Sequence, residues 1–329
     1  MARGGANPIR PPLPRGALLE TLRLKREVAL HGGALQPIPT RERLVREGDL
    51  ELILRVVENL GRKDLAGCQA AGQGEQGPDG LRPNEPAARA EARDPFLPYE
   101  EDLFVADITE THVALLNKYN VVDEHLLLVT REFERQESPL GQEDFEALCR
   151  CLVEYPSLGF YNCGVLAGAS QPHKHLQLVP LPLGPHGLEV PISPLLAGTA
   201  PEGAMERPGR VSLAPGLPFR HAISRLGEGL WRGSTAQAAR ELVSRYLELL
   251  GALGRLPQRG PEGWTCPPYN LLCTREWMLV VPRENERFEG VSLNSLAFAG
   301  CFLVRDDAEA ELLLRAGPMR ALISAAGAR

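Results

Sequence analysis

This sequence lacks long apolar runs, an excess of positive charge and an even number of cysteines. No stretch of about 18 apolar residues occurs, which argues against a transmembrane helix. The formal net charge is -6, so the chain has no overall attraction for nucleic acid or an anionic membrane. The seven cysteines are odd in number and irregularly spaced, so we expect free thiols and a cytoplasmic location.

The length and composition are those of an ordinary globular protein. The 329 residues suffice for one large domain or two moderate ones, and 43% of them are hydrophobic. Residues 1–16 are rich in Arg and Pro and lack an apolar core, which predicts a disordered tail rather than a signal peptide. Residues 67–93 are rich in Gly, Pro and Ala, which predicts a mobile insertion.

Residue periodicity predicts a mixture of strands and helices. Strands are expected over residues 112–116, 125–130, 158–162, 173–179, 269–274 and 277–281, and residues 50–60 fit a helix or a strand. Helices are expected over residues 143–155, 235–250 and 308–325, the last interrupted near Gly317-Pro318, and residues 183–218 are expected to form a long loop. The two hairpin-like strand pairs favour an antiparallel sheet, hence the α+β class.

One stretch carries the chemistry, and it runs from Gly168 through Ala169-Ser170-Gln171-Pro172 to His173-Lys174-His175-Leu176-Gln177. Alternate residues of a strand face the same way, so His173, His175 and Gln177 share one face. The Gly-Ala-Ser turn before them lets main-chain N–H groups approach an anion. Because neutral imidazole can attack phosphorus, the row of His173, His175 and Gln177 offers a nucleophile or base beside a turn that can bind phosphate.

A metal site and a purely structural histidine are two other interpretations of this row. A His-x-His pair offers two nitrogens on one face, but Gln177 is a poor zinc ligand and no nearby Cys or carboxylate completes the set. Cys149 and Cys151 do not supply a site either, because Cys149 falls on an apolar helical stripe and no second ligand pair follows. We therefore favour phosphate chemistry and expect no metal held by the protein alone.

The motif resembles the active-site motif of the diadenosine tetraphosphate phosphorylases, which are histidine-triad proteins with Gln in place of the third His. Residues 117–130, 269–283 and 290–300 resemble the same family, and the likeness covers about 96–179 and 218–304. It implies an α+β, histidine-triad-like antiparallel sheet with flanking helices, elaborated by N-terminal and C-terminal extensions. The implied parts are an N-terminal portion (17–66), a catalytic core (94–215) and a C-terminal region (216–329) that completes the nucleotide site.

The resemblance implies phosphorolysis of diadenosine tetraphosphate (Ap4A) to ATP and ADP, reversible as an ATP adenylyltransferase. His175 would attack the α-phosphorus and expel ATP, and phosphate would then take AMP from the adenylyl-histidine. His173 would fix the neighbouring backbone and polarise the phosphate, and Gln177 would donate its amide N–H to an α-phosphate oxygen. The remaining implied substrate contacts are Lys63, Asp94, Pro95, Asn162, Gly168, Ala169, Ser170, Gln171, Asn270, Thr274, Met278 and Arg283.

The expected partners are then small molecules only: a dinucleoside polyphosphate, ATP, ADP and phosphate, with no nucleic acid and no membrane. We expect Mg²⁺ or another divalent cation to arrive with the substrate phosphates, because their charge needs neutralising.

Competing functions stay open from the sequence. Hexose-1-phosphate uridylyltransferases use a similar His-Pro-His-x-Gln motif, but Lys174 stands here in place of the Pro, and the Cys/His pattern of their metal site is missing. Another histidine-triad nucleotidyltransferase or a dinucleoside polyphosphate hydrolase is the main alternative, although a hydrolase would more naturally carry a third His at position 177. A nucleotide sensor without catalysis is disfavoured by the intact His173, His175 and Gln177.

Overall fold

The computed structural model describes residues 9–11, 13–58, 94–196, 211–261 and 263–329. Three expected features therefore lie wholly or mostly outside the described residues, namely Lys63, the 67–93 insertion and the 1–16 tail. Within the described residues, no helix has the length and apolar character needed to cross a membrane.

A nine-stranded antiparallel sheet forms the centre of the molecule. Its strands lie in the order β3-β4-β5-β7-β6-β12-β13-β9-β8. Their bounds are β3 Phe104–Asp107, β4 His112–Leu116, β5 Leu126–Thr130, β6 Ser157–Cys163, β7 His175–Pro180, β8 Val211–Ser212, β9 Ala222–Arg225, β12 Tyr269–Cys273 and β13 Trp277–Pro282. The expected α+β class and antiparallel sheet are confirmed.

Smaller sheets and the helices surround this sheet. A three-stranded sheet has the order β1-β2-β16, and two-stranded ribbons are formed by β10 with β11 and by β14 with β15. These strands are β1 Thr40–Glu47, β2 Leu50–Val57, β10 Gln258–Gly260, β11 Gly263–Thr265, β14 Arg287–Phe288, β15 Val291–Ser292 and β16 Cys301–Val304. The α-helices are α1 Leu18–His31, α3 Gln142–Leu152, α4 Ser193–Leu196, α5 Thr235–Ala252, α6 Ser295–Phe298, α7 Asp307–Ala316 and α8 Pro318–Ala326. Short 3₁₀ turns are η1 Glu101–Leu103, η2 Val165–Ala167, η3 Pro185–Gly187 and η4 Glu228–Arg232.

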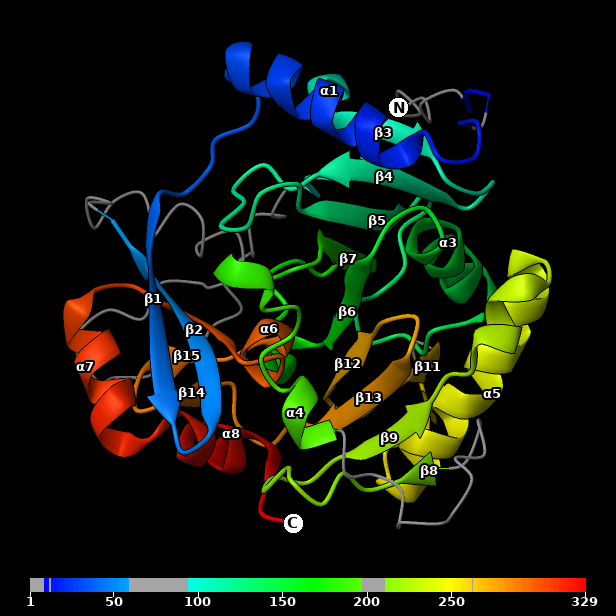
Figure 1. Cartoon of the computed structure of the whole chain (residues 1–329). Helices are drawn as coiled ribbons and strands as arrows, with labels where there is room; N and C mark the ends of the chain where they lie inside the picture. Colours follow the sequence, from blue (N-terminus) through cyan, green and yellow to red (C-terminus); the bar gives the residue numbers. More distant parts are fainter. Residues whose placement is uncertain (1–8, 12, 59–93, 197–210, 262) are drawn as a thin grey trace, which may run out of the picture.

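The central sheet is covered on both faces. Helices α1, α3 and α5 pack one hydrophobic cluster against one face, and α6, α7, α8 and the three-stranded sheet pack a second cluster against the other (Figure 1). Strands covered on both faces need apolar residues at consecutive positions. This explains β5, whose five residues are all buried.

Several local predictions are confirmed by the observed elements. The side chain of Ser234 caps α5 by accepting the main-chain N–H of Gln237, although the helix runs to Ala252 rather than ending at 250. Strands β12 and β13 form the expected hairpin, and the C-terminal helix is divided at Gly317-Pro318.

Other elements differ from the local predictions. Residues 50–60, which fitted a helix or a strand, contain strand β2, and residues 183–218 contain η3, α4 and β8 rather than an uninterrupted loop. Helix α1 and strands β1, β9 and β16 were not anticipated. Strand β16 pairs in parallel with β2, some 250 residues earlier in the chain, and no local pattern encodes such a pairing.

Candidate active site

The motif residues lie at the start of strand β7, on the face that points away from α3 and α5. His175 and Gln177 project from this face, while Leu176 and Leu178 pack into the cluster under those helices. His173 precedes the strand and forms an isolated bridge with Arg135. The expected common face of His175 and Gln177 is therefore present, and His173 is held beside it by a separate pairing.

One ring nitrogen of His175 is anchored by a hydrogen bond, and the other is available. Its Nδ1 donates to the main-chain carbonyl of His173 at 2.8 Å, and its Nε2 has no hydrogen bond within the described residues. The ring packs against Phe96, with 5.5 Å between ring centroids. Burial lowers the pKa of His175 to about 4, against a smaller opposing effect of the hydrogen bond to His173. The ring is therefore neutral near pH 7, and Nε2 keeps its lone pair.

His173 is fixed by acceptors at both ring nitrogens. Its Nδ1 lies 2.8 Å from a carboxylate oxygen of Asp94, and its Nε2 lies 2.8 Å from the main-chain carbonyl of Thr130. Asp94 also accepts the N–H of Phe96 at 2.9 Å, so one carboxylate holds both His173 and the loop that carries Phe96. Pro95 sits exposed in that loop. His173 thus positions its own carbonyl, to which His175 is anchored.

Gln177 is oriented by His125, which the sequence did not single out. The ring Nε2 of His125 donates to the side-chain oxygen of Gln177 at 3.0 Å, and Asn117 donates to the ring Nδ1 at 3.2 Å. Burial lowers the pKa of His125 to about 4, so this ring is neutral and has a single N–H for Gln177. The amide nitrogen of Gln177 is left facing away from His125.

The loop between β6 and β7 offers main-chain donors at two of the four expected positions, Ser170 and Gln171. The N–H groups of Gly168 and Ala169 are used inside the loop, where they donate to the carbonyls of Val165 and Gly164. The N–H groups of Ser170 and Gln171 have no acceptor within the described residues. Gly168 has φ +86°, and a Cβ there would lie 2.8 Å from Asn294 Cβ, so only glycine fits.

Behind this loop, Asn162, Asn270 and Arg283 form a buried network. Asn270 donates to Asn162 Oδ1 at 2.8 Å and to the carbonyl of Ala167 at 2.8 Å, and Arg283 donates to Asn270 Oδ1 at 2.7 Å. Asn162 Oδ1 also accepts from the main-chain N–H of Ser295 at 3.0 Å. This network supports the loop from behind, and the direct nucleotide contacts that the resemblance implied for these residues stay a prediction.

Thr274 and Met278 lie away from the row that contains His175. Met278 is fully buried in the cluster under α3 and α5, on the opposite face of the sheet. Thr274 lies in the β12–β13 turn, where its hydroxyl accepts the N–H of Glu276 at 3.1 Å. Both side chains have structural contacts, and we leave them out of the proposed site.

Lys174 brings a buried charge to the opposite face of β7. Its Nζ lies 2.7 Å from Asp144 and 3.0 Å from Glu134, and Asp144 also bonds His112 at 3.1 Å. Burial raises the pKa of Asp144, but the hydrogen bond with His112 and the charge of Lys174 outweigh burial, so its pKa is lowered overall. Lys174 therefore ties the motif to the N-terminus of α3 and does not face the substrate side.

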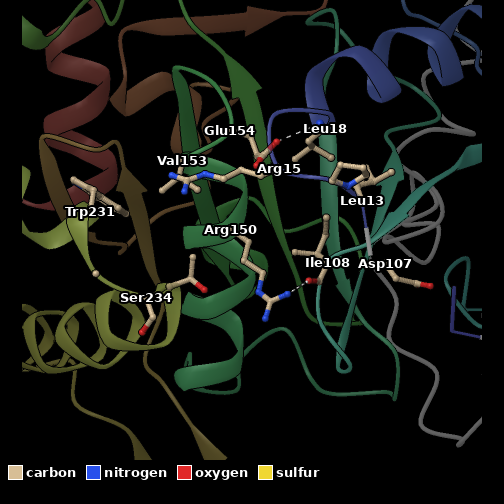
Figure 2. Close-up of a pocket in the computed structure, with 13 residues that line it drawn as sticks. Leu13, Arg15, Leu18, Asp107, Ile108, Arg150, Val153, Glu154, Trp231 and Ser234 are labelled. Carbon is tan, nitrogen blue, oxygen red and sulfur yellow. Dashed lines mark hydrogen bonds between the residues drawn. The ribbon is translucent and has the colours of Figure 1, made fainter. Parts of the chain in front are cut away.

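A separate cavity of about 420 Å³ lies on the helix-covered side of the molecule. Figure 2 shows Arg150 of α3 lining it together with Val153 and Glu154, which follow the helix, and with Trp231 and Ser234 across from them. Arg150, which lines this cavity, belongs to α3, and α3 packs on the face of the sheet opposite to the one that carries His175. Among the described residues, no three His, Cys or acidic side chains gather in a way that would hold a metal ion.

Comparison with known proteins identifies the family of the chain. Residues 9–198 match the family model described as Ap4A phosphorylase N-terminal domain, and residues 215–328 match that of the ATP adenylyltransferase C-terminal domain. The fold and site thus define a nucleotidyltransferase. The chain belongs to the Ap4A phosphorylase family.

The relatives and solved structures agree with this assignment. Diadenosine 5',5'''-P1,P4-tetraphosphate phosphorylase 2 of Saccharomyces cerevisiae is 30% identical over 68% of this chain and 72% of its own length. Protein APA1 of the same organism is 28% identical over 66% and 70% of the two chains. The crystal structure of yeast Ap4A phosphorylase Apa2 has the same fold, with a TM-score of 0.71, 22% identity and 94% of each chain covered.

Proposed function

We propose that this enzyme converts Ap4A and phosphate into ATP and ADP through an adenylyl group carried on His175. The observation that carries the proposal is the neutral, buried His175 with its Nδ1 anchored and its Nε2 available. A nucleophile activated in this way splits one displacement at phosphorus into two easier steps. The yeast relative is named as a phosphorylase of the same dinucleotide, which supports the proposal.

In the first step, His175 Nε2 attacks the α-phosphorus of one adenosine, and the bond from that phosphorus to its bridging oxygen breaks. ATP leaves with the bridging oxygen and its electron pair. In the second step, an oxygen of inorganic phosphate attacks the same phosphorus, and the phosphorus–nitrogen bond breaks. The product is ADP, and His175 regains its lone pair.

The neighbouring residues stabilise the charge that develops on the equatorial oxygens. The amide nitrogen of Gln177, held in place through His125, is proposed to donate to an α-phosphate oxygen. The N–H groups of Ser170 and Gln171 are proposed to bind the other phosphate oxygens, since they have no other acceptor within the described residues. His173 and Asp94 keep the His175 ring aligned.

We further propose that this arrangement is the histidine-triad one, with Gln177 in the third position. The core at residues 94–215 would carry the nucleophile, and the region at 216–329 would complete the site from behind through Asn270 and Arg283. The six cysteines within the described residues are unpaired, which supports a cytoplasmic location.

A divalent cation is proposed to enter with the polyphosphate. Asp94, the carboxylate nearest to the motif histidines, is already bonded to His173 and to the N–H of Phe96, so it does not offer a free ligand. Mg²⁺ is commonly held by substrate phosphates, water and only one or two carboxylates. The cation would supply charge neutralisation on the phosphates.

The test is product analysis with Ap4A in the presence and absence of phosphate. With phosphate, ATP and ADP should form in equal amounts, and without it the reaction should stop after one equivalent of ATP per enzyme. His175→Ala should abolish both turnover and covalent labelling, whereas His173→Ala should weaken labelling and leave the attachment site in place. ATP and AMP at the full rate without phosphate would make the protein a hydrolase, and a label on His173 would overturn the assignment of the nucleophile.

A further inference from the structure

Strands β6 and β7 separate before they reach the nucleophile. Their pairing runs from Ser157↔Pro180 to Phe160↔Gln177 and stops there, two positions short of His175. The carbonyl of Lys174 accepts the N–H of Thr130 on the β5 side, so the N–H and C=O of His175 point toward β6. The separation makes room for the loop that leaves β6 and returns to β7. It also removes the main-chain partners that His175 would have had.

The side chain of Gln136 fills this gap. Its Oε1 accepts the main-chain N–H of His175 at 2.9 Å, and its Nε2 donates to the carbonyl of His175 at 3.2 Å and to the carbonyl of Asn162 at 2.9 Å. One side-chain amide therefore takes the place of the main-chain hydrogen bonds that β6 would otherwise make with His175. Both N–H groups of that amide and its oxygen are used.

Gln136 is itself held rigidly. Its main-chain N–H donates to the carbonyl of Pro172 at 2.8 Å, and its own carbonyl accepts the hydroxyl of Tyr161. The residue is 1% exposed. A nearby main-chain bond, from Lys174 N–H to the carbonyl of Glu134 at 2.8 Å, fixes the same stretch of chain to the motif. These contacts fix the side-chain amide of Gln136, called the clamp below, in place relative to His175.

We propose that Gln136 is a positioning residue for the reaction, which holds the main chain of His175 so that Nε2 stays aimed at the substrate phosphorus. This inference rests on the proposed role of His175 as nucleophile. A displacement of about 1 Å at a reacting group costs on the order of 100-fold in rate. The clamp acts on the chemical step and touches no substrate, so it should change kcat more than KM.

Two substitutions separate the hydrogen bonds from the packing. Gln136→Met keeps the shape of the side chain and removes all three bonds. Gln136→Glu keeps the acceptor for the His175 N–H but places a carboxylate beside two carbonyls. We expect each variant to lose about 100-fold in kcat and in the single-turnover rate of labelling by Ap4A that carries ³²P at its α-phosphorus, with KM changed less than about threefold.

Two control variants distinguish positioning from general loss of stability. Leu249→Ala opens a cavity in α5, in the core under the opposite face of the sheet. Gln237→Met makes the same chemical change at the α5 cap, where that glutamine also bonds the main chain. Both controls should keep kcat within about threefold of the wild type, even where thermal unfolding shows Leu249→Ala to be the less stable protein.

The outcomes separate this inference from the proposed function. If either Gln136 variant keeps the kcat of Leu249→Ala, or raises only KM, the positioning role is overturned. If Gln136→Met does not fold, Gln136→Glu carries the same test, because it keeps the shape and one hydrogen bond. If His175→Ala is still labelled in the same assay, the proposed function itself fails. Loss of labelling in His175→Ala together with normal labelling in Gln136→Met overturns only the inference about Gln136.

Discussion

Replacing Arg283 with Met tests whether this residue supports the loop or contacts nucleotide. The guanidinium is 1% exposed and donates to Asn270 Oδ1 at 2.7 Å and to four main-chain carbonyls: Leu293 at 2.8 Å, Asn285 at 2.7 Å, Glu286 at 3.2 Å and Ala167 at 3.3 Å. Burial lowers the pKa of Arg283 to about 10, which shows that desolvation of the charge is substantial. We expect Arg283→Met to be markedly less stable than the wild type.

The size of the expected loss of stability follows from the hydrogen-bond acceptors that lose their donor in Arg283→Met. An acceptor left without its donor costs about 1–3 kcal/mol. Three of the five acceptors lose their donor here, because the carbonyls of Ala167 and Glu286 keep the N–H groups of Asn270 and Leu293. Removing the buried charge and admitting water return part of this cost, so the net loss is about 3–5 kcal/mol. For a chain of this size, such a loss lowers Tm by roughly 6–10 °C.

The assay combines thermal unfolding with Ap4A kinetics. Arg259→Met is the control, because Arg259 is exposed on β10, and the free energy of unfolding should change by less than about 0.5 kcal/mol. An Arg283→Met protein with wild-type Tm and a raised KM would refute the reasoning. Arg283 would then be a nucleotide contact, as the resemblance implied.

Three further predictions concern the histidine face. Gln177→Ala should lower kcat by roughly 100- to 1,000-fold with little change in KM, because it removes a donor that acts mainly in the transition state. If steady-state kinetics give the variant the kcat of the wild type, Gln177 is structural. The rate of His175 labelling should stay level from pH 8 to about pH 5 and fall as the pH approaches 4, where the ring is protonated; a decline centred near pH 6.5 would contradict a buried, neutral nucleophile. The pKa values of His125 and His175 are about 4 in the folded protein and about 6.5 in the unfolded chain, so the unfolded chain binds more protons between these values. This part of the stability is fully present above pH 6.5 and is lost as the pH falls toward 4, by up to about 3 kcal/mol for each histidine. A free energy of unfolding in urea that is the same at pH 5 and at pH 7.5 would rule this out.

The local pattern was sufficient where a residue acts through its place on its own element. Strand alternation put His175 and Gln177 on one face, and the capping pattern marked the start of α5 at Ser234. Hairpin signals located β12 and β13. These features depend on residues within a few positions of one another, which is the range over which periodicity and capping act.

The local pattern says less where a residue acts through distant partners. The family resemblance implied a nucleotide contact for Met278, whereas the structure buries this side chain on the face of the sheet opposite to His175. It also expected donors at Gly168 and Ala169, whose N–H groups are used within their own loop. No spacing in the sequence distinguishes a polar residue that faces substrate from one that faces another buried polar group.

The sequence by itself determined the histidine motif at residues 173–177 and the antiparallel, α+β character of this protein. Only the tertiary structure decided which groups hold the motif in place. His125 reaches Gln177 across 52 positions, Gln136 reaches His175 across 39, and Asn270 reaches Asn162 across 108. These contacts depend on strand order and register, which arise when the whole chain buries its apolar faces together, and no local segment carries that information.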